Sequence, residues 1–266
     1  MDTPLSHGPI ADAILGHDRH GHGPRRVLVL HDWLGDCTGW DAVRPWLDGE
    51  AFTYVFADLR GYGRSRHLAG EYHVAEISAD VLRLADRLGW QRFHLVGHSM
   101  TGMAAQRIAA DAPARVASAV AVCPATAAGL GLDEAAQAFF ARAMHDDEAF
   151  GRLVRFVTGG RLSEGWVRAK LRQHRTTVAP ECRTGYLRML VGTRFVDDVR
   201  GGTTPWLVLV GDRDPGIDEA AMRRSFLTWY ADATLSVLAD CGHYPMQERP
   251  PAFAAIVEAF LGGSGG

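Results

Sequence analysis

Short apolar runs alternate along the chain with longer amphipathic stretches. The runs are almost continuously apolar, which is typical of strands buried on both faces of a parallel sheet. They cover Arg26–His31, Thr53–Asp58, Arg92–His98, Val116–Cys123, Thr204–Val210 and Thr234–Ala239. Apolar positions recur near a 3.6-residue period over 74–88, 100–112 and 251–261, which predicts helices there. This alternation predicts an α/β fold with a doubly wound, mostly parallel sheet.

The stretch 127–200 breaks this rhythm, because it contains several helical patterns rich in aromatic residues and methionine but no clear strand. An insertion of this size between two strands indicates a small helical cap. We therefore expect a core formed by 1–126 and 201–266, with 127–200 as the cap. The residues before the first buried strand are expected to form an antiparallel hairpin at the sheet edge.

Composition narrows the classes of partner. The chain has 266 residues, of which 47% are hydrophobic and 22% charged, and its formal net charge is −3. This composition suffices for a large core, but it offers no basic surplus to neutralise nucleic-acid phosphates. No apolar stretch approaches the roughly 18 residues of a membrane-spanning helix. We expect a small-molecule substrate, with no nucleic acid or membrane as partner; oligomeric state is not predictable from these features.

The four cysteines, Cys37, Cys123, Cys182 and Cys241, form no CxxC pair and match no zinc-binding spacing. The N-terminus lacks the long apolar run of a secretory signal. These features predict reduced thiols and a cytoplasmic location. They also predict neither a metal nor a cofactor.

The strongest local signal is the sequence LVGHSMTG at 95–102. A predicted strand runs through Gly97-His98-Ser99 directly into a predicted helix, which is the context of a nucleophile elbow. In such a turn the Ser99 hydroxyl is exposed above the sheet, and the helix N-terminus behind it offers free N–H groups. The alternative is that Ser99 merely caps the helix.

With this motif the chain resembles the α/β-hydrolase family over nearly its whole length. The segment DLRGYGRSR at 58–66 resembles a characteristic loop of that family and indicates structure rather than chemistry. Members usually have glycine two residues after the nucleophile, where this chain has Thr101. The Thr101 side chain must therefore find room inside the elbow.

The resemblance also implies the partners that a serine nucleophile requires. Gly242-His243-Tyr244-Pro245 matches the loop that carries the catalytic histidine, and Asp214 in LVGDRDPG matches the family acid better than Asp212. The order Ser99, Asp214, His243 is that of the family. His98, next to Ser99, is expected on the pocket wall.

Two backbone amides are expected to form an oxyanion hole, those of Met100 and Trp33. The family usually reads His-Gly before the second donor, where this chain has His31-Asp32. We expect Asp32 to adopt an unusual backbone conformation and to point its carboxylate away from the oxyanion. Trp33, His98 and Tyr244 are the expected substrate contacts.

These features predict a serine hydrolase that cleaves a small to medium, mostly apolar carboxylic ester or lactone through an acyl-enzyme. Aromatic and methionine side chains of the cap would roof the pocket, although Arg161, Arg168, Lys170 and Arg172 could bind a charged acid. Two alternatives stay open: a perhydrolase or carbon–carbon bond hydrolase with the same triad, and a non-catalytic ligand-binding receptor. A haloalkane dehalogenase is disfavoured, because that chemistry uses an aspartate where this chain has Ser99.

Overall fold

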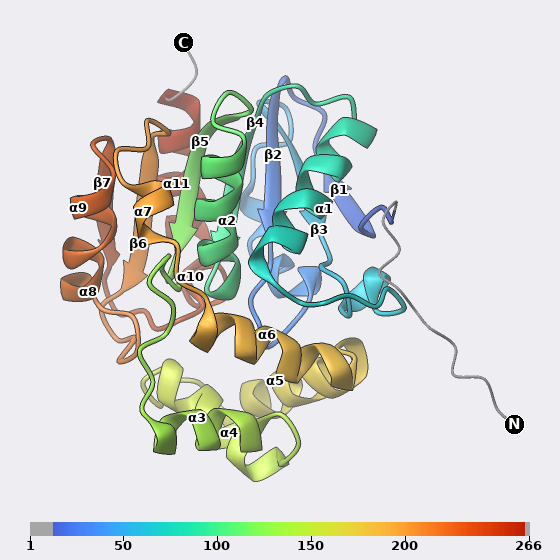
Figure 1. The fold of residues 1–266 in the computed structure, drawn as a ribbon, viewed down its shortest axis with the longest axis vertical. Coiled ribbons are helices and arrows are strands. Elements are labelled where there is room, and N and C mark those ends of the chain that lie inside the picture. Colours follow the sequence, from blue (N-terminus) through green and yellow to red (C-terminus); the bar gives the residue numbers. More distant parts are fainter. Residues whose placement is uncertain (1–12, 264–266) are drawn as a thin grey trace, which may run out of the picture.

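The computed structural model describes residues 13–263, which form a central sheet covered by helices on both faces (Figure 1). The strands are β1 (His17–His20), β2 (Arg25–Leu30), β3 (Phe52–Ala57), β4 (Phe93–His98), β5 (Val116–Val122), β6 (Trp206–Gly211) and β7 (Ala233–Leu238). Their order in the sheet is β1-β3-β2-β4-β5-β6-β7. All neighbouring pairs are parallel except β1 with β3. The predicted α/β fold with a mostly parallel, doubly wound sheet is confirmed.

The predicted edge hairpin is wrong in its pairing. β1 is an antiparallel edge strand, but its partner is β3, with His17 opposite Ala57, so β3 lies between β1 and β2. Residues 1–12, which belong to the segment expected to form the hairpin, lie outside the described residues. β2 pairs with β3 along one edge and with β4 along the other, so neither edge of β2 is free for β1.

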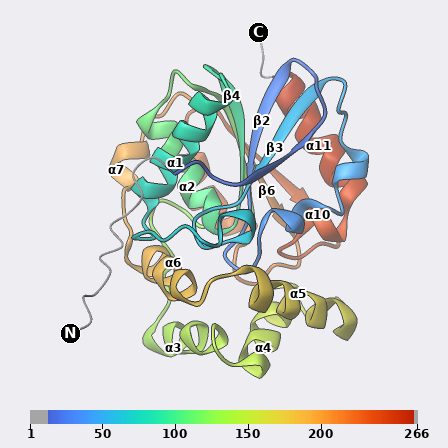
Figure 2. The ribbon, with the colours of Figure 1, turned by 90° about the vertical axis from the view of Figure 1, so that its right-hand side faces the viewer.

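Helices cover the two faces in the way that the apolar periodicity requires. Figure 2 shows α1 (Val74–Arg87) and α2 (Met100–Asp111) on one face, and α10 (Pro245–Glu248) and α11 (Pro250–Gly263) on the other. Each face buries its own apolar cluster. One cluster includes Met103 and Leu84, and the other includes Trp40 and Phe253. α8 (Glu219–Arg224) and α9 (Phe226–Trp229) precede β7.

The segment between β5 and β6 forms helices and no strand of the central sheet. These helices are α3 (Glu134–Ala143), α4 (Asp147–Val157), α5 (Glu164–Thr177), α6 (Pro180–Gly192) and α7 (Val196–Val199). Both ribbon views show α3 to α6 as a layer at the carboxyl ends of the parallel strands (Figures 1 and 2). α7 instead packs on α2, where Asp198 pairs with Arg107 at 2.5 Å. The last residues of the expected cap segment therefore contact the core rather than cover the strand ends.

The described residues contain no helix that combines the length and apolarity needed to cross a membrane. The four cysteines all lie within residues 13–263, are buried, and form no disulfide there.

Candidate active site

Ser99 occupies a sharp turn between β4 and α2. Its φ is +56° and its ψ −113°, which is strained for a residue with a side chain. The turn closes only because glycines flank it. A Cβ on Gly97 would come within 2.3 Å of the Thr101 carbonyl oxygen, and one on Gly102 within 2.3 Å of Pro124 Cβ. Ser99 holds the N-cap position of α2, yet its hydroxyl caps no helical amide. The capping alternative therefore does not explain this serine.

Thr101 fits the elbow through hydrogen bonds rather than by leaving space. Its buried hydroxyl accepts the His98 amide at 2.9 Å and lies 3.1 Å from the Leu30 carbonyl oxygen, to which it can donate. The hydroxyl thus ties the end of β4 to the end of β2. These hydrogen bonds stabilise threonine at position 101, where the family usually has glycine. The position that approaches Pro124 too closely for a side chain is Gly102.

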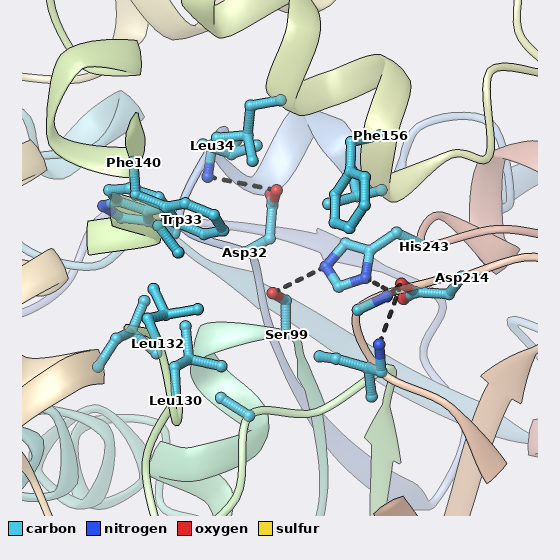
Figure 3. Close-up of a pocket in the computed structure, with 17 residues that line it drawn as sticks. Asp32, Trp33, Leu34, Ser99, Leu130, Leu132, Phe140, Phe156, Asp214 and His243 are labelled. Carbon is cyan, nitrogen blue, oxygen red and sulfur yellow. Dashed lines mark hydrogen bonds and ion pairs between the residues drawn. The ribbon is translucent and has the colours of Figure 1, made fainter. Parts of the chain in front are cut away.

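The structure brings Ser99, His243 and Asp214 into one hydrogen-bonded chain (Figure 3). His243 Nε2 lies 2.9 Å from the Ser99 hydroxyl, and His243 Nδ1 lies 2.5 Å from Asp214 Oδ2. The other Asp214 oxygen accepts the amides of Gly216 at 2.9 Å and Ile217 at 3.2 Å. Both carboxylate oxygens are therefore fixed, which holds the imidazole with Nε2 toward the serine.

The neighbouring carboxylate of Asp212 has a different role. It accepts the Cys241 amide at 3.1 Å and lies 3.5 Å from Arg213, so it braces the loop that carries His243. In the described part of the chain, the hydrogen bonds of the His243 ring go to Asp214 and Ser99, and none goes to Asp212. The geometry thus separates two acids that stand only two positions apart in the sequence.

The rings of His98 and His243 are neighbours, but their surroundings shift the pKa values of the two side chains in opposite directions. Burial by itself lowers the pKa of His243, but the Asp214 carboxylate and its hydrogen bond outweigh burial and raise it overall. Burial lowers the pKa of His98 to about 3, so this ring is neutral at physiological pH. His98 Nε2 donates to the His243 carbonyl at 2.8 Å. It supports the backbone of the proposed base instead of competing with it.

The amides of Trp33 and Met100 are available for an oxyanion. Within residues 13–263, no protein acceptor binds either N–H group. The Trp33 indole donates to the Arg183 carbonyl at 2.9 Å. The backbone carbonyl of Trp33 accepts a hydrogen bond from the Tyr62 hydroxyl at 3.0 Å. The residue is therefore held at both its side chain and its backbone.

Asp32 does not need the unusual conformation expected from the sequence. Asp32 is not among the described non-glycine residues with positive φ, so its backbone conformation does not require glycine. Its carboxylate is buried and accepts the Tyr244 hydroxyl at 2.8 Å and the Leu34 amide at 3.2 Å. It is turned toward Tyr244, yet Asp32 still lines the same cavity as Ser99.

Ser99 lies at the floor of a cavity of about 260 Å³. Figure 3 shows Trp33, Leu130, Leu132, Phe140 and Phe156 around it. The remaining apolar lining is supplied by Leu34, Ala125, Ala136, Leu153, Val157, Leu190 and Ile217. Among the described residues that line the cavity, the charged or hydroxyl-bearing side chains are those of Asp32, Ser99, His243 and Asp214.

Two of the three expected substrate contacts are displaced from this lining. Trp33 is part of it and stacks on Phe140 at 6.0 Å between ring centroids. His98 and Tyr244 are not, because both are buried beneath His243 and bond elsewhere, His98 to the His243 carbonyl and Tyr244 to Asp32. Adjacency to Ser99 or His243 in the sequence did not reveal that these side chains point into the protein.

Most of the cap lining was not identifiable from the sequence. Among the many aromatic and methionine residues of the cap, Phe140 and Phe156 reach the cavity, whereas Phe150 and Tyr186 pack inside the protein. Leu190 also reaches it, whereas Leu130, Leu132 and Leu153 line it without any distinguishing signal in the sequence. Spacing along a helix identifies an apolar face but not which part of that face remains uncovered.

One group of side chains has potential metal-ligand spacing. Ligand atoms of Cys123, Asp214 and His243 lie within 4.8 Å of one another. The pKa of the Cys123 thiol is raised well above its usual value, first by burial and then by Asp214. Asp214 and His243 already bond to each other, and His243 also bonds to Ser99. Two of the three potential ligands are therefore engaged in the chain that ends at Ser99.

Known proteins resemble this chain, some over most of its length and others over part of it. The family model described as "Alpha/beta hydrolase family" matches residues 13–256. An acetyltransferase component of an acetoin cleaving system from Cupriavidus necator is 29% identical over 256 residues, which are 92% of this chain and 66% of that protein. A fluoroacetate dehalogenase from a Burkholderia species is 40% identical over 103 residues, which are 37% of this chain and 33% of that protein. The chain thus spans about two thirds and one third of these relatives.

Solved structures show the same fold at lower identity. A hydrolase from Oleispira antarctica has a TM-score of 0.84 at 15% identity and covers 95% of this chain and 96% of its own. An esterase from Exiguobacterium antarcticum has a TM-score of 0.82 at 16% identity, with 92% and 94% covered. With the family match over 13–256, the sheet order and the elbow geometry, the chain belongs to the alpha/beta hydrolase family.

Proposed function

We propose that this protein is a serine hydrolase that cleaves a small to medium, mostly apolar carboxylic ester or lactone through an acyl-enzyme. The observation that carries the proposal is the bonded chain Asp214–His243–Ser99 at the floor of an apolar cavity. A serine hydroxyl is a weak nucleophile alone, and a base within hydrogen-bond reach activates it.

The positions of these groups support the following reaction. Ser99 Oγ attacks the substrate carbonyl carbon while His243 Nε2 takes the hydroxyl proton, and the carbonyl π electrons move onto oxygen. The amides of Trp33 and Met100 hold this oxyanion, and Asp214 stabilises the imidazolium. Collapse expels the alkoxide, which receives the proton from His243. Water, deprotonated by the same nitrogen, then attacks the acyl-enzyme carbonyl carbon. The bond from this carbon to Ser99 Oγ breaks, His243 returns the proton to Oγ, and the acid leaves.

The cavity supports an uncharged, apolar acyl group. Pockets of this kind bind mainly through apolar contact with few polar groups to fix orientation. Among the described residues that line it, no lysine or arginine is present. Arg168 and Arg172 of α5 are exposed, and Arg161 pairs with Asp240 and Glu248. Lys170 is buried against Asp32, at 3.6 Å. None of these four cations lines the cavity that holds Ser99.

The similarity to a fluoroacetate dehalogenase does not redirect the proposal. Displacement of halide by a carboxylate gives an ester, which water can hydrolyse. Displacement by Ser99 would give an ether, which the same site could not hydrolyse. The serine at this position thus supports acyl transfer.

Covalent labelling by a fluorophosphonate, combined with a panel of esters and lactones, tests the proposal. We expect wild-type protein to be labelled at Ser99 and to hydrolyse several substrates, and Ser99→Ala to lose both activities, with turnover reduced by about 10⁶-fold as for other serine nucleophiles. Ser236→Ala on β7, away from the cavity, should behave as wild type. Labelling that persists in Ser99→Ala would contradict the nucleophile.

The same panel separates the alternatives. A perhydrolase would convert esters to peracids when peroxide is added, and a carbon–carbon bond hydrolase would cleave a diketone-like substrate faster than any ester. A binding protein would show ligand affinity with neither turnover nor labelling.

A further inference from the structure

Lys170 is chemically singular in this chain. The sequence contains 28 lysine and arginine residues, and Lys170 is the only lysine. It lies on α5 with a side chain only 3% exposed, whereas the flanking cations Arg168 and Arg172 are exposed. An ammonium group is costly to bury unless a charge compensates it.

The compensating charge is Asp32. Lys170 Nζ lies 3.6 Å from Asp32 Oδ1 and 4.6 Å from the ring centroid of Tyr244, which itself donates to Asp32 Oδ2. Within the described part of the chain, Nζ has no hydrogen-bond partner. Gly35 leaves the space that it occupies, since a Cβ there would lie 2.8 Å from Nζ.

The Asp32 carboxylate is fixed beside the place where negative charge would develop. Asp32 directly precedes Trp33, whose amide is one proposed oxyanion donor, and it lines the cavity together with Ser99 and His243. Figure 3 shows its carboxylate bonded to the Leu34 amide on the cavity wall. An unneutralised carboxylate here would repel the oxyanion in a medium that screens charge poorly.

Apart from Lys170, the described groups that interact with Asp32 and can carry a positive charge are His98, His31 and His243. His243 is neutral when it acts as a base and gains its charge only during the reaction. His98 of β4 is neutral, because burial lowers its pKa to about 3. His31 Nε2 accepts the Leu59 amide at 3.1 Å, so this nitrogen carries no proton. Tyr244 contributes a hydroxyl without charge. Lys170 is thus the positive group that holds the Asp32 carboxylate ionised at low cost.

The same face of α5 also holds the backbone of the loop that follows β2. Gln173 donates to Asp36 Oδ1 at 2.8 Å, and His174 Nδ1 lies 3.2 Å from the Leu34 carbonyl, to which it can donate. Residues 170, 173 and 174 lie on one helical face. The helix therefore supplies this loop with both its fixed position and its countercharge.

We propose that Lys170 is a positioning residue that neutralises Asp32 from the helical layer, so that the oxyanion amides work beside a carboxylate without electrostatic penalty. The role rests on the proposed serine hydrolase function. It makes α5 a part of the electrostatics of the site, although none of its side chains lines the cavity.

The test compares Lys170→Met with the double variant Asp32→Asn/Lys170→Met and with Arg172→Met, a matched control that removes an exposed cation from the same helix. The readouts are kcat and KM for the best ester, and the rate of fluorophosphonate labelling, across pH. We expect Lys170→Met to lower kcat by about 10- to 100-fold with little change in KM. The double variant should recover to within about threefold of wild type, and Arg172→Met should match wild type.

The pH dependence distinguishes neutralisation from simple packing. Without Lys170, the Asp32 carboxyl takes up a proton more readily, and below its new pKa it is neutral and harmless. The deficit of Lys170→Met should therefore grow as pH rises, and the double variant should show no such trend. A deficit that is independent of pH and persists in the double variant would overturn the proposal, as would wild-type rates in Lys170→Met.

Two further measurements keep the outcome decisive. If Lys170→Met does not fold, as its thermal melt would show, the soluble double variant still tests whether losing both charges is tolerated. Loss of activity in the double variant would contradict the proposal.

Because Lys170 is the only lysine, a sample labelled at the lysine ζ nitrogen gives one NMR signal. This signal should move in Asp32→Asn and would stay unchanged if the pair were absent. Wild-type protein that is neither labelled nor active would overturn the proposed function itself.

Discussion

The floor and the roof of the cavity differ in the kind of side chain that they contribute. The floor comes from loops at the carboxyl ends of strands and carries Ser99, Asp214 and His243, each held by specific hydrogen bonds. The roof comes from α3, α4, α6 and the segment before α3, and it contributes only apolar side chains. A polar group works only in one position, whereas apolar contacts of similar volume can replace one another. Changes in the floor should therefore abolish the reaction, and changes in the roof should redirect it.

Asp214→Asn should give the largest effect among the variants that keep the nucleophile. We expect kcat to fall by about 10⁴-fold, since the amide cannot fix the His243 tautomer or stabilise its charged form. Turnover of the best ester, measured with a thermal melt to verify folding, checks this. Asp212→Asn is the matched control, because it removes a loop hydrogen bond to Cys241 but no contact with the imidazole. If Asp212→Asn proved the more damaging of the two, the acid would be wrongly assigned.

Leu132→Trp should reshape the roof without harming the floor. In wild type, kcat/KM should rise about fourfold for each added methylene of the acyl chain, as ~0.8 kcal/mol per buried methylene implies, until the cavity is filled. Leu132 is half-buried in the lining, so an indole there shortens the space. We expect about a tenfold loss with medium-chain esters and little change with acetate esters.

Chain-length profiles of both proteins measure this difference. An equal loss on acetate and medium-chain esters would mean that Leu132 affects the floor. Full activity of wild type on emulsified long-chain triglyceride would contradict a cavity roofed by the helical layer.

The pH dependence of kcat/KM should show the smallest effect. It should depend on the floor of the cavity and not on the roof. His243 must be unprotonated to act as a base, and its pKa is raised above the ordinary histidine value of about 6.5 because Asp214 outweighs burial. The kcat/KM of free enzyme should therefore be full above this raised pKa and decline as pH falls through it. Leu132→Trp should keep the same acid limb. An acid limb well below pH 6 would show that Asp214 does not dominate the environment of the imidazole.

The sequence by itself determined the strands, the main helices and the positions of the proposed catalytic residues. Buried parallel strands need continuous apolar runs, and a nucleophile elbow needs glycines where backbones approach within van der Waals contact, as at Gly97. These requirements act on residues close together in the chain, so they leave a local pattern. Ser99 could be predicted because the elbow leaves such a pattern. Asp214 and His243 could be predicted only because their loops resemble those of the alpha/beta hydrolase family.

Only the tertiary structure decided which side chains share a space. β1 pairs with β3 because β2 has no free edge, His98 and Tyr244 turn under His243, and Lys170 reaches Asp32 from a distant helix. Each of these contacts depends on how separate elements pack, and the apolar period of a helix is the same whether its buried face meets a cavity or another helix. The charge on Asp32 could be read from the sequence, but the group that neutralises it could be identified only once α5 was placed against the loop after β2.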